Sequence, residues 1–304
     1  MPGSRSTRGY FAAASAPFMV GLGVAASSVL VRYPAFASQG ARYFLGSLII
    51  LLVFRSQVRL PAGMGYRDLF HLALLTLVGL VIFSTSTIEA LRYASAAGVG
   101  VIVGCVPLVL TLSGLVVERR RPTAALLGGV ALATSGAIVV NGVASISGTG
   151  IVFALIAMLS DAAFSLLAAR LVEKTGPVPL AFATNLAAGA TMLFMALLLH
   201  HGDLVPTASQ ATAIVFTAVA VSFGSFVLWY SGLASLGVAR AGVFVALIPV
   251  GALAGQLAVG GRPIEPLQLL GVAAVVAGLV LAIVWGRESS GPQLYDRLDL
   301  DGST

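Results

Sequence analysis

Ten apolar stretches, each about as long as a membrane is thick, follow one another along the sequence. A helix needs about 20 apolar residues to cross the hydrocarbon core of a bilayer. Stretches of this length lie at residues 10–31, 35–54, 68–91, 95–117, 123–141, 149–172, 178–200, 208–233, 239–260 and 266–286. Charged residues make up only 9% of the chain, whereas soluble domains carry about 25%. The sequence therefore predicts an all-α integral membrane protein with ten transmembrane helices.

The basic residues predict how these helices are oriented. With ten helices, both termini lie on the same side. Of 17 Lys and Arg residues, 13 fall on the side of the termini, Arg32, Arg92 and Arg262 fall on the other, and Arg42 falls within a helix. Because cytoplasmic loops are enriched in Lys and Arg, we expect a multi-pass protein of the inner (plasma) membrane with cytoplasmic termini. These residues are spread over short connections rather than one basic face, so nucleic acid is not an expected partner.

The remaining motifs do not indicate an enzyme, a cofactor or a metal site. The sequence has no GxxxxGK[ST] motif, and GVGVIVG (98–104) differs from the dinucleotide fingerprint GxGxxG and follows no predicted strand. Its single cysteine and its three histidines, His71, His200 and His201, do not form a plausible set of metal ligands. Residues 288–304 are polar and lack periodicity, and we expect them to form a disordered cytoplasmic tail.

The two halves of the sequence match each other when the chain is shifted by 142 positions. This shift pairs Leu91 with Leu233, Gly100 with Gly242, Pro107 with Pro249, Arg120 with Arg262, Gly129 with Gly271, and Gly136 with Gly278. Each half contains five helices, and because five is odd the halves insert in opposite orientations. The sequence thus predicts one repeat over residues 1–145 and a second, inverted repeat over 146–287. In such proteins the substrate site lies near the bilayer midplane between the repeats.

A longer pattern occurs in both halves. It reads ALRYASAAGVGVIVGCVPLVLTLSGLVVERRRPTAALLGGVALATSGAIVV in the first and LGVARAGVFVALIPVGALAGQLAVGGRPIEPLQLLGVAAVVAGLVLAIV in the second. The pattern resembles the EamA-type unit of the drug/metabolite transporter superfamily: an A-L-x-Y end of the third helix, a proline within the fourth, a glutamate closing the fourth and a glycine-rich fifth. Glu118 faces Gly260 in this alignment, and Asp161 stands where such units often carry an aromatic residue. The resemblance covers residues 10–286. It implies a central cavity and the export or exchange of small metabolites, most familiarly amino acids.

Asp161 is a candidate substrate-binding residue because it lies near the middle of an apolar stretch. A carboxylate at the bilayer centre costs at least about 2.5–3.5 kcal/mol on insertion scales, so it normally faces a cavity or a partner. Three interpretations remain open. In the first, Asp161 forms an ion pair with Arg42, which is also a candidate substrate-binding residue. In the second, Asp161 binds the amino group of a substrate or a coupling proton. In the third, it hydrogen-bonds the hydroxyls of Ser160 and Ser165.

The stretch FSTSTIEALRY (83–93) is the most polar sequence within a predicted helix. Ser86 and Glu89 are three residues apart and therefore share one side of the helix. Together with Arg92 and Tyr93, Glu89 is expected to frame an outer vestibule for the substrate. The alternative is a charge near the helix end that contacts lipid headgroups.

Three further candidate substrate-binding residues are Trp229, Tyr230 and Asn185. Trp and Tyr are enriched at the two membrane interfaces, which is one interpretation of Trp229 and Tyr230. The other is a wall or gate on which an apolar substrate stacks. Asn185 aligns loosely with Arg42 in the other half and is expected to hydrogen-bond a neighbouring helix.

Pro107 and Pro249 are expected to act as a pair of hinges, because they occupy equivalent places in the two halves. A proline within a helix removes one backbone hydrogen bond and displaces the carbonyl four residues earlier, here those of Val103 and Val245. A static kink that improves packing is the alternative. Two glycine pairs with a spacing of four, Gly100 with Gly104 and Gly251 with Gly255, predict small-residue faces for close helix contact.

The sequence as a whole favours a secondary transporter that exports small amphiphilic metabolites, most simply amino acids, by alternating access. Protons are a candidate coupling ion, and facilitated diffusion is the alternative. An exporter of drugs or apolar metabolites would instead have aromatic cavity walls and depend little on Asp161. A membrane scaffold or partner-binding protein, which does not transport, is the interpretation from another functional class.

Overall fold

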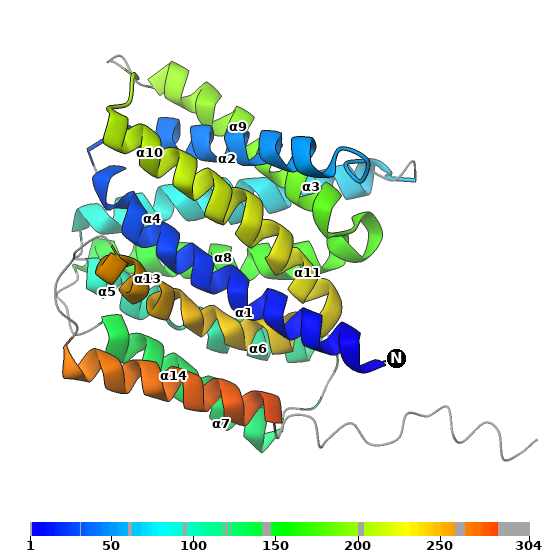
Figure 1. Cartoon of the computed structure of the whole chain (residues 1–304), viewed down its shortest axis with the longest axis vertical. Coiled ribbons are helices and arrows are strands. Elements are labelled where there is room, and N and C mark those ends of the chain that lie inside the picture. The colour runs from blue at the N-terminus through cyan, green and yellow to red at the C-terminus, as the bar shows by residue number, and fades with distance from the viewer. Residues whose placement is uncertain are drawn as a thin grey trace, which may run out of the picture.

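The computed structural model describes residues 2–30, 32–59, 63–93, 96–117, 119, 121, 123–141, 147–199, 204–258 and 265–284. Within these residues the regular elements are helices, packed side by side as one bundle (Figure 1). Among them, nine helical runs are long and apolar enough to cross a membrane, and a tenth apolar helix, Ala124–Val140, is shorter. The prediction of a ten-helix membrane protein is confirmed. The predicted tail, 288–304, and the repeat boundary at 145 and 146 lie outside the described residues.

The first five crossings follow the predicted order. They consist of α1 (Pro2–Ala26) with the 3-10 turn η1 (Ser27–Leu30); α2 (Ala35–Phe54); α3 (Tyr66–Thr76), the π-helical segment η2 (Leu77–Ile82) and α4 (Phe83–Tyr93) as one run; α5 (Ala96–Val103) with α6 (Val106–Val117); and α7 (Ala124–Asn141).

The second five crossings repeat this arrangement. They consist of α8 (Gly148–Thr175); α9 (Pro177–Leu199); α10 (Ala208–Thr217), the π-helical segment η3 (Ala218–Ser225) and α11 (Phe226–Leu236) as one run; α12 (Val238–Val243), the 3-10 turn η4 (Phe244–Ala246) and α13 (Leu247–Ala258) as another; and α14 (Pro266–Val284).

The same irregularities recur at equivalent places in the two halves. A shift of 142 positions moves η2, Leu77–Ile82, onto residues 219–224, which lie within η3, Ala218–Ser225. A π-helical segment is rare and is often found at functional sites. Its presence at paired positions of the two halves supports the predicted internal repeat, which stays a prediction.

The helices that carry the paired prolines are interrupted, which corrects the expectation of prolines within continuous helices. A turn at Gly104 and Cys105 separates α5 from α6, and η4 precedes α13. Pro107 and Pro249 therefore lie in the first turn of α6 and of α13. There proline is tolerated because the amide hydrogen that it lacks would have no helical partner. The hinge role of the two prolines stays a prediction.

Two equivalent helices, α7 and α14, pack antiparallel through their glycines. A Cβ atom on Gly129 would lie 2.7 Å from the Gly278 carbonyl oxygen, and one on Gly136 would lie 2.6 Å from that of Gly271. The shift that relates the halves maps Gly129 to Gly271 and Gly136 to Gly278. Equivalent helices that run in opposite directions are what an inverted repeat requires.

A second close contact joins α1 to α13. A Cβ atom on Gly21 would lie 2.1 Å from the Ile248 carbonyl oxygen, and one on Gly251 would lie 2.1 Å from that of Phe18. Gly255 packs in the same way against Ala25, at 2.7 Å. The predicted small-residue face of Gly251 and Gly255 is confirmed. Backbones in this bundle approach one another so closely that side chains do not fit between them.

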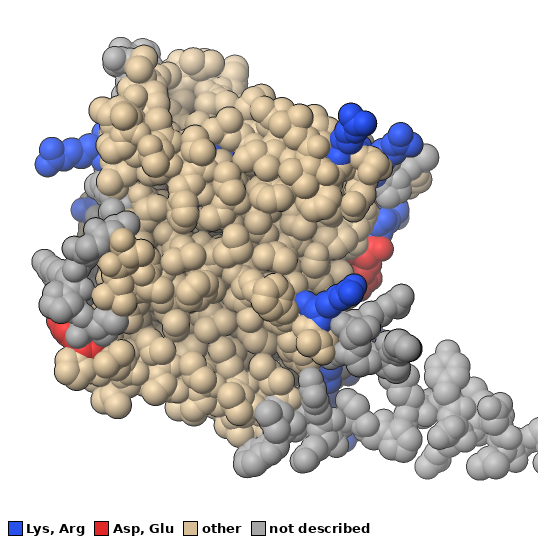
Figure 2. Space-filling view, viewed as in Figure 1, with Lys and Arg blue, Asp and Glu red and all other residues tan. Residues whose placement is uncertain are grey.

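The outside of the bundle is apolar between its two ends. Large apolar side chains such as Leu52, Val116 and Leu197 are exposed along it. Figure 2 shows the charged residues of the visible face at the two ends of the bundle, with other residues between them. We call the end at which α1 begins the N-terminal face. This surface fits a lipid bilayer, in which the apolar side chains meet the acyl chains.

Caps fix where two helices of the second half begin. The Ser147 hydroxyl oxygen accepts a hydrogen bond from the Gly150 amide at the start of α8. At the start of α10, the Thr207 hydroxyl accepts from the Gln210 amide at 3.4 Å, and the Gln210 side chain accepts from the Thr207 amide at 2.9 Å. This reciprocal pair is a capping box and satisfies amides that the helix itself leaves unbonded.

Thr207→Ala is expected to lower the free energy of unfolding by about 1 kcal/mol, because it removes the cap of α10. The measurement is reversible unfolding by SDS of the purified protein in micelles. Thr212→Ala removes a hydroxyl from the same helix that bonds only the Ala208 carbonyl, and should change the stability by less than about 0.5 kcal/mol. Equal effects of the two substitutions would contradict the capping role.

Candidate functional site

Asp161 lies halfway along α8 and faces the interior of the bundle. The residues that share its side of the helix, Ala157, Phe164, Ser165 and Ala168, are all buried. Helix α8 packs against α3, α4, α5 and α6 of the first half and against α9 and α11 of the second. On this side of α8, Phe164 lies against Gly79 of η2. The carboxylate is half-buried, and no hydrogen bond or ion pair joins it to any residue that the structure describes.

Two of the three interpretations of Asp161 are therefore wrong for this structure. It forms no ion pair with Arg42, and neither Ser160 nor Ser165 donates a hydrogen bond to it among the described residues. The remaining interpretation, in which Asp161 binds a substrate amino group or a proton, stays a prediction.

Arg42 binds its own neighbour instead of a carboxylate. Its guanidinium carbon lies 4.4 Å from the centre of the Tyr43 ring, and its Nη2 donates a hydrogen bond to the Tyr43 hydroxyl at 2.8 Å. Its Nε is buried and has no hydrogen-bond partner among the residues that the structure describes. A buried donor without a partner costs about 1–3 kcal/mol or more when charged, so Arg42 retains an unused capacity to bind an anion.

Four rings from three helices form an aromatic cluster beside these charges. Tyr43 of α2 contacts Phe226 of α11 edge to face, with centroids 6.0 Å apart, and Phe164 of α8 contacts Phe226 at 5.7 Å. Tyr230 completes the cluster, at 5.8 Å from Phe164 and 5.9 Å from Phe226. Both halves of the chain contribute to this cluster. Sequence reasoning missed Tyr43, Phe164 and Phe226, although the first adjoins Arg42 and the second lies three residues after Asp161.

The aromatic cluster includes rings that are close in the chain to Arg42 and Asp161, two residues that lie at similar depth. At 1.5 Å per residue, Asp161 is about 21 Å from the end of α8 at the N-terminal face. Arg42 is about 18 Å from the end of α2 at the same face. Tyr43 adjoins Arg42 along the chain, and Phe164 is one turn from Asp161. Near the middle of the bundle, one acidic and one basic residue are therefore each within one helical turn of a ring of the aromatic cluster.

Trp229 and Tyr230 are buried in the protein, which contradicts the membrane-interface interpretation. Trp229 is 7% exposed and Tyr230 is 0% exposed. The hydroxyls of Tyr230 and Thr184 are 3.2 Å apart and hydrogen-bond across the interface between α11 and α9. Their side of α11 faces the core, so these residues do not reach the headgroups. Their role in binding substrate stays a prediction.

Asn185 is fully buried but does not make the expected bond to another helix. Its Nδ2 donates to the Ala181 carbonyl of its own helix at 2.8 Å, and its Oδ1 has no partner among the described residues. The hydroxyl of Ser222, in η3, is likewise buried without a partner. Buried polar groups without a hydrogen-bond partner are rare in folded proteins.

Glu89, Arg92 and Tyr93 lie in the last turns of α4, at the end of the bundle opposite the N-terminal face. Glu89 Oε1 and Arg92 Nη1 are 3.2 Å apart, and the Tyr93 ring stacks on that of Phe153 at 6.2 Å. Ser86, one turn away, is buried. Glu89 lies about 6 Å from the end of α4, whereas Asp161 lies about 20 Å from the beginning of α8 at the same face. This cluster is thus separate in depth from Asp161.

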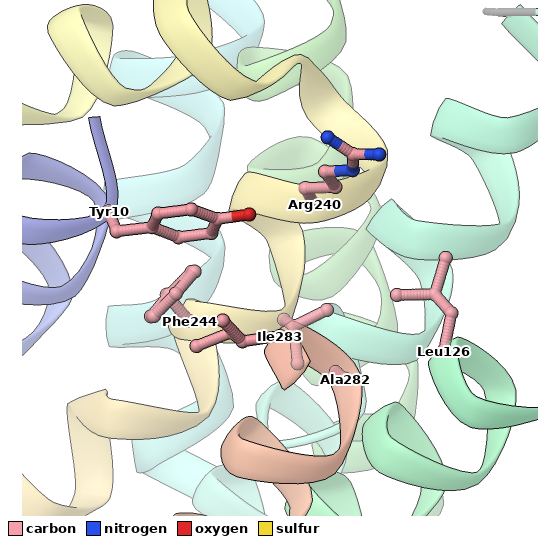
Figure 3. Close-up of a pocket in the computed structure, with 7 residues that line it drawn as sticks. Tyr10, Leu126, Arg240, Phe244, Ala282 and Ile283 are labelled. Carbon is pink, nitrogen blue, oxygen red and sulfur yellow. The ribbon is translucent and has the colours of Figure 1, made fainter. Parts of the chain in front are cut away.

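A pocket opens at the N-terminal face, away from the predicted substrate residues (Figure 3). Its walls come from α1, α7, α12, η4 and α14 and include Tyr10, Leu126, Arg240, Phe244, Ala282 and Ile283. Figure 3 shows the Tyr10 hydroxyl pointing toward Arg240. Within the described residues there is no group of three or more His, Cys, Asp and Glu side chains placed to hold a metal ion.

Comparisons with known proteins agree with this architecture. The model of the EamA-like transporter family matches residues 7–142 and again residues 148–284. An uncharacterized transporter of Bacillus subtilis (strain 168), YetK, is 25% identical over an alignment of 288 residues, and the match covers 90% of this chain and 86% of that protein. A solved crystal structure has a TM-score of 0.79 at 18% identity and covers 95% of this chain and 99% of that chain. This last likeness concerns the fold alone.

Proposed function

Because the chain belongs to the EamA-like transporter family, we propose that it carries a small zwitterionic metabolite, most simply an amino acid, across the membrane. The observation that carries this proposal is the pair of uncompensated charges near the middle of the bundle. Asp161 has no partner among the described residues, and Arg42 keeps a buried Nε without one. A substrate with one ammonium and one carboxylate group would satisfy both.

Each charge has a distinct role in this proposal. The Asp161 carboxylate accepts hydrogen bonds from the substrate ammonium group. The planar guanidinium of Arg42 suits a carboxylate because it offers several N–H donors in a fixed fork. The aromatic cluster, which has a ring near each of the two residues, contacts the apolar part of the substrate and excludes water. Exclusion of water strengthens both charged contacts, because it lowers the local dielectric constant.

Alternating access accounts for movement across the membrane. Support comes from the paired π-helical segments η2 and η3 and from the interrupted helices at Pro107 and Pro249, which we propose as the places where each half bends. Exchange of conformation between inverted halves would open the centre to one side and then to the other. The distribution of Arg and Lys supports cytoplasmic termini in the inner membrane. With this orientation we propose transport outward from the cytoplasm, with Asp161 as the site of any coupled proton.

A second candidate substrate class follows from the aromatic cluster itself. Rings from α2, α8 and α11 suit an apolar or aromatic compound, as in an exporter of drugs or apolar metabolites. Asp161 would then contribute little to binding. Membership of a transporter family favours transport over the role of a scaffold.

Counterflow in proteoliposomes tests the substrate class. Vesicles loaded with unlabelled amino acids are expected to accumulate external labelled amino acid several-fold above protein-free vesicles. An excess of the same amino acid should compete, but its N-acetyl derivative and its amide should not, because each lacks one of the two charges. Repeating the assay with and without a pH gradient tests proton coupling. Competition by apolar cations but by no zwitterion would replace the leading proposal with the second.

A further inference from the structure

Three rings of the aromatic cluster lie nearer the N-terminal face than Asp161 does. At 1.5 Å per residue, Phe164 of α8 is about 17 Å from the end of its helix at this face, whereas Asp161 is about 21 Å from it. By the same rise, Phe226 and Tyr230 are about 15 Å and about 9 Å from the end of α11 at this face. A path along α8 and α11 from the depth of Asp161 to the N-terminal face therefore passes these rings.

The three rings hold α8 and α11 together at this depth. The Phe164 ring lies 5.7 Å from that of Phe226 and 5.8 Å from that of Tyr230. Phe164 is 8% exposed and Tyr230 is 0% exposed. The hydrogen bond between the Tyr230 and Thr184 hydroxyls also ties the Tyr230 side chain to α9. On this side of Asp161, α8 and α11 separate only if the ring contacts break.

The first half has no rings at the places equivalent to Phe226 and Tyr230. The shift of 142 positions pairs Phe226 with Ser84 and Tyr230 with Ile88. Ser84 and Ile88 are about 14 Å and about 8 Å from the end of α4 at the opposite face. They thus lie at matching depths on the other side of the bundle, where they offer a hydroxyl and an aliphatic chain instead of two rings.

The counterpart of Phe164 is a glycine. A Cβ atom on Gly79 of η2 would lie 2.5 Å from the Phe164 ring. The same shift pairs Gly79 with Val221 of η3, and a Cβ atom on Gly23 of α1 would lie 2.4 Å from the Val221 side chain. Gly23 therefore occupies in the first half the place that Phe164 occupies in the second. The fold tolerates a glycine there, so the ring is a feature of the N-terminal side alone.

A second contact joins the two halves at the N-terminal face. A Cβ atom on Gly114 of α6 would lie 2.5 Å from the Ala239 backbone nitrogen of α12, and the Thr111 hydroxyl donates to the Ala239 carbonyl at 3.3 Å. The shift relates α6 to α13 and α12 to α5. Between the described residues of α13 and α5 there is no comparable contact. The halves are thus packed together more closely at the N-terminal face than at the equivalent place on the opposite side.

We propose that Phe164, Phe226 and Tyr230 form a gate between the substrate site and the N-terminal face, and that this gate is shut in the present structure. Opening toward this face requires Phe164 to move away from the two rings of α11, and α6 to separate from α12. Packed rings suit a gate because they exclude water while they remain in contact. The inference rests on the proposed transport, but it concerns the route to the site and not the identity of the substrate.

Labelling of a thiol introduced at position 161 tests the gate without any substrate. Asp161→Cys is made in a chain that carries Cys105→Ala, and a membrane-impermeant maleimide is added to one side of oriented vesicles. Gly63→Cys and Gly148→Cys report the two sides, because each of these glycines lies in open space at one end of the bundle. The thiol at position 161 is expected to react faster from the Gly148 side than from the Gly63 side.

Phe164→Ala should raise the labelling rate from the Gly63 side about tenfold, because it removes both ring contacts of α8 with α11. Tyr230→Phe should raise it about threefold, because it removes only the hydrogen bond to Thr184. This second variant keeps the packing, so its effect does not depend on a cavity. The matched control is Phe153→Ala, which removes a ring from α8 near the opposite face and should change this rate less than about twofold.

Three results would each overturn the proposal. They are labelling of the parent chain at least as fast from the Gly63 side as from the Gly148 side, no change in rate with either Phe164→Ala or Tyr230→Phe, and an equal rise with Phe153→Ala. Thermal unfolding of each variant in detergent shows whether the fold is retained. Absence of amino-acid counterflow together with the expected labelling would overturn the substrate assignment and leave the gate in place.

Discussion

Asp161→Asn is expected to lower binding and counterflow of a zwitterionic substrate about 10- to 100-fold. Asparagine keeps the shape of the side chain but removes its charge, and a hydrogen bond to a charged group contributes about 1.5–3 kcal/mol. The variant should fold normally, because the Asp161 carboxylate makes no ion pair with any described residue. The measurements are equilibrium binding of labelled amino acid in detergent and counterflow in proteoliposomes.

Glu89→Gln is the comparison for equilibrium binding in this experiment, because the predicted outer vestibule at Glu89 is separate in depth from Asp161. Glu89 also lies in a membrane-spanning helix, but it is paired with Arg92 near the helix end and is 34% exposed. Loss of an exposed ion pair changes stability by at most about 1 kcal/mol, and binding near the middle of the bundle should be unaffected. If Asp161→Asn transported zwitterions at the wild-type rate, Asp161 would be excluded as a substrate-binding residue. Equal loss of equilibrium binding in both variants, together with a lower unfolding temperature in detergent, would indicate general damage rather than a specific contact at Asp161.

Gly129→Ala is expected to lower the free energy of unfolding by about 1–3 kcal/mol, because it overpacks the contact between α7 and α14. The added Cβ atom would lie 2.7 Å from the backbone nitrogen of Ala282 and from the carbonyl oxygen of Gly278. Backbone atoms on a neighbouring helix cannot rotate away, so the two helices must separate. Reversible unfolding by SDS measures the loss.

The neighbouring Gly128→Ala provides a matched control in the same helix. Its Cβ atom would meet only the Leu281 side chain at 3.6 Å, which is an ordinary van der Waals contact. Alanine also favours the helix by about 1 kcal/mol over glycine, so this variant should be neutral or more stable. If both alanines destabilised the protein equally, α7 would be rotated against α14 differently from the arrangement in the structure.

The helices were predictable because each depends on a local property, the length of an apolar stretch. All ten predicted stretches correspond to a helical run in the structure. The paired glycines of α7 and α14 were visible in the sequence as well, because the repeat preserves them. The interruption before Pro107 and Pro249 was not predictable, since a proline in an apolar stretch is compatible with a kinked or a broken helix.

The site was harder to predict because it depends on how each helix is rotated. Arg42 and Asp161 have opposite charges and similar depths, which made an ion pair plausible. The hydroxyl of the adjacent Tyr43 instead accepts a hydrogen bond from one guanidinium nitrogen of Arg42. Trp229 and Tyr230 lie near a helix end, as interface residues do, yet their side of α11 faces the core. The residue pattern of a single helix does not determine which neighbouring side chains it will contact.

The surface that joins α7 to α14 is close to self-complementary. Gly129 meets Gly278 and Gly136 meets Gly271, and the repeat makes each of these pairs equivalent to the other. A five-helix ancestor that inserted in both orientations could therefore have formed a homodimer through this same surface, with one isologous interface. Gene duplication and fusion would then have made one polypeptide of the dimer. Once fused, each copy could acquire residues that the other lacks, as Asp161 and Tyr230 illustrate.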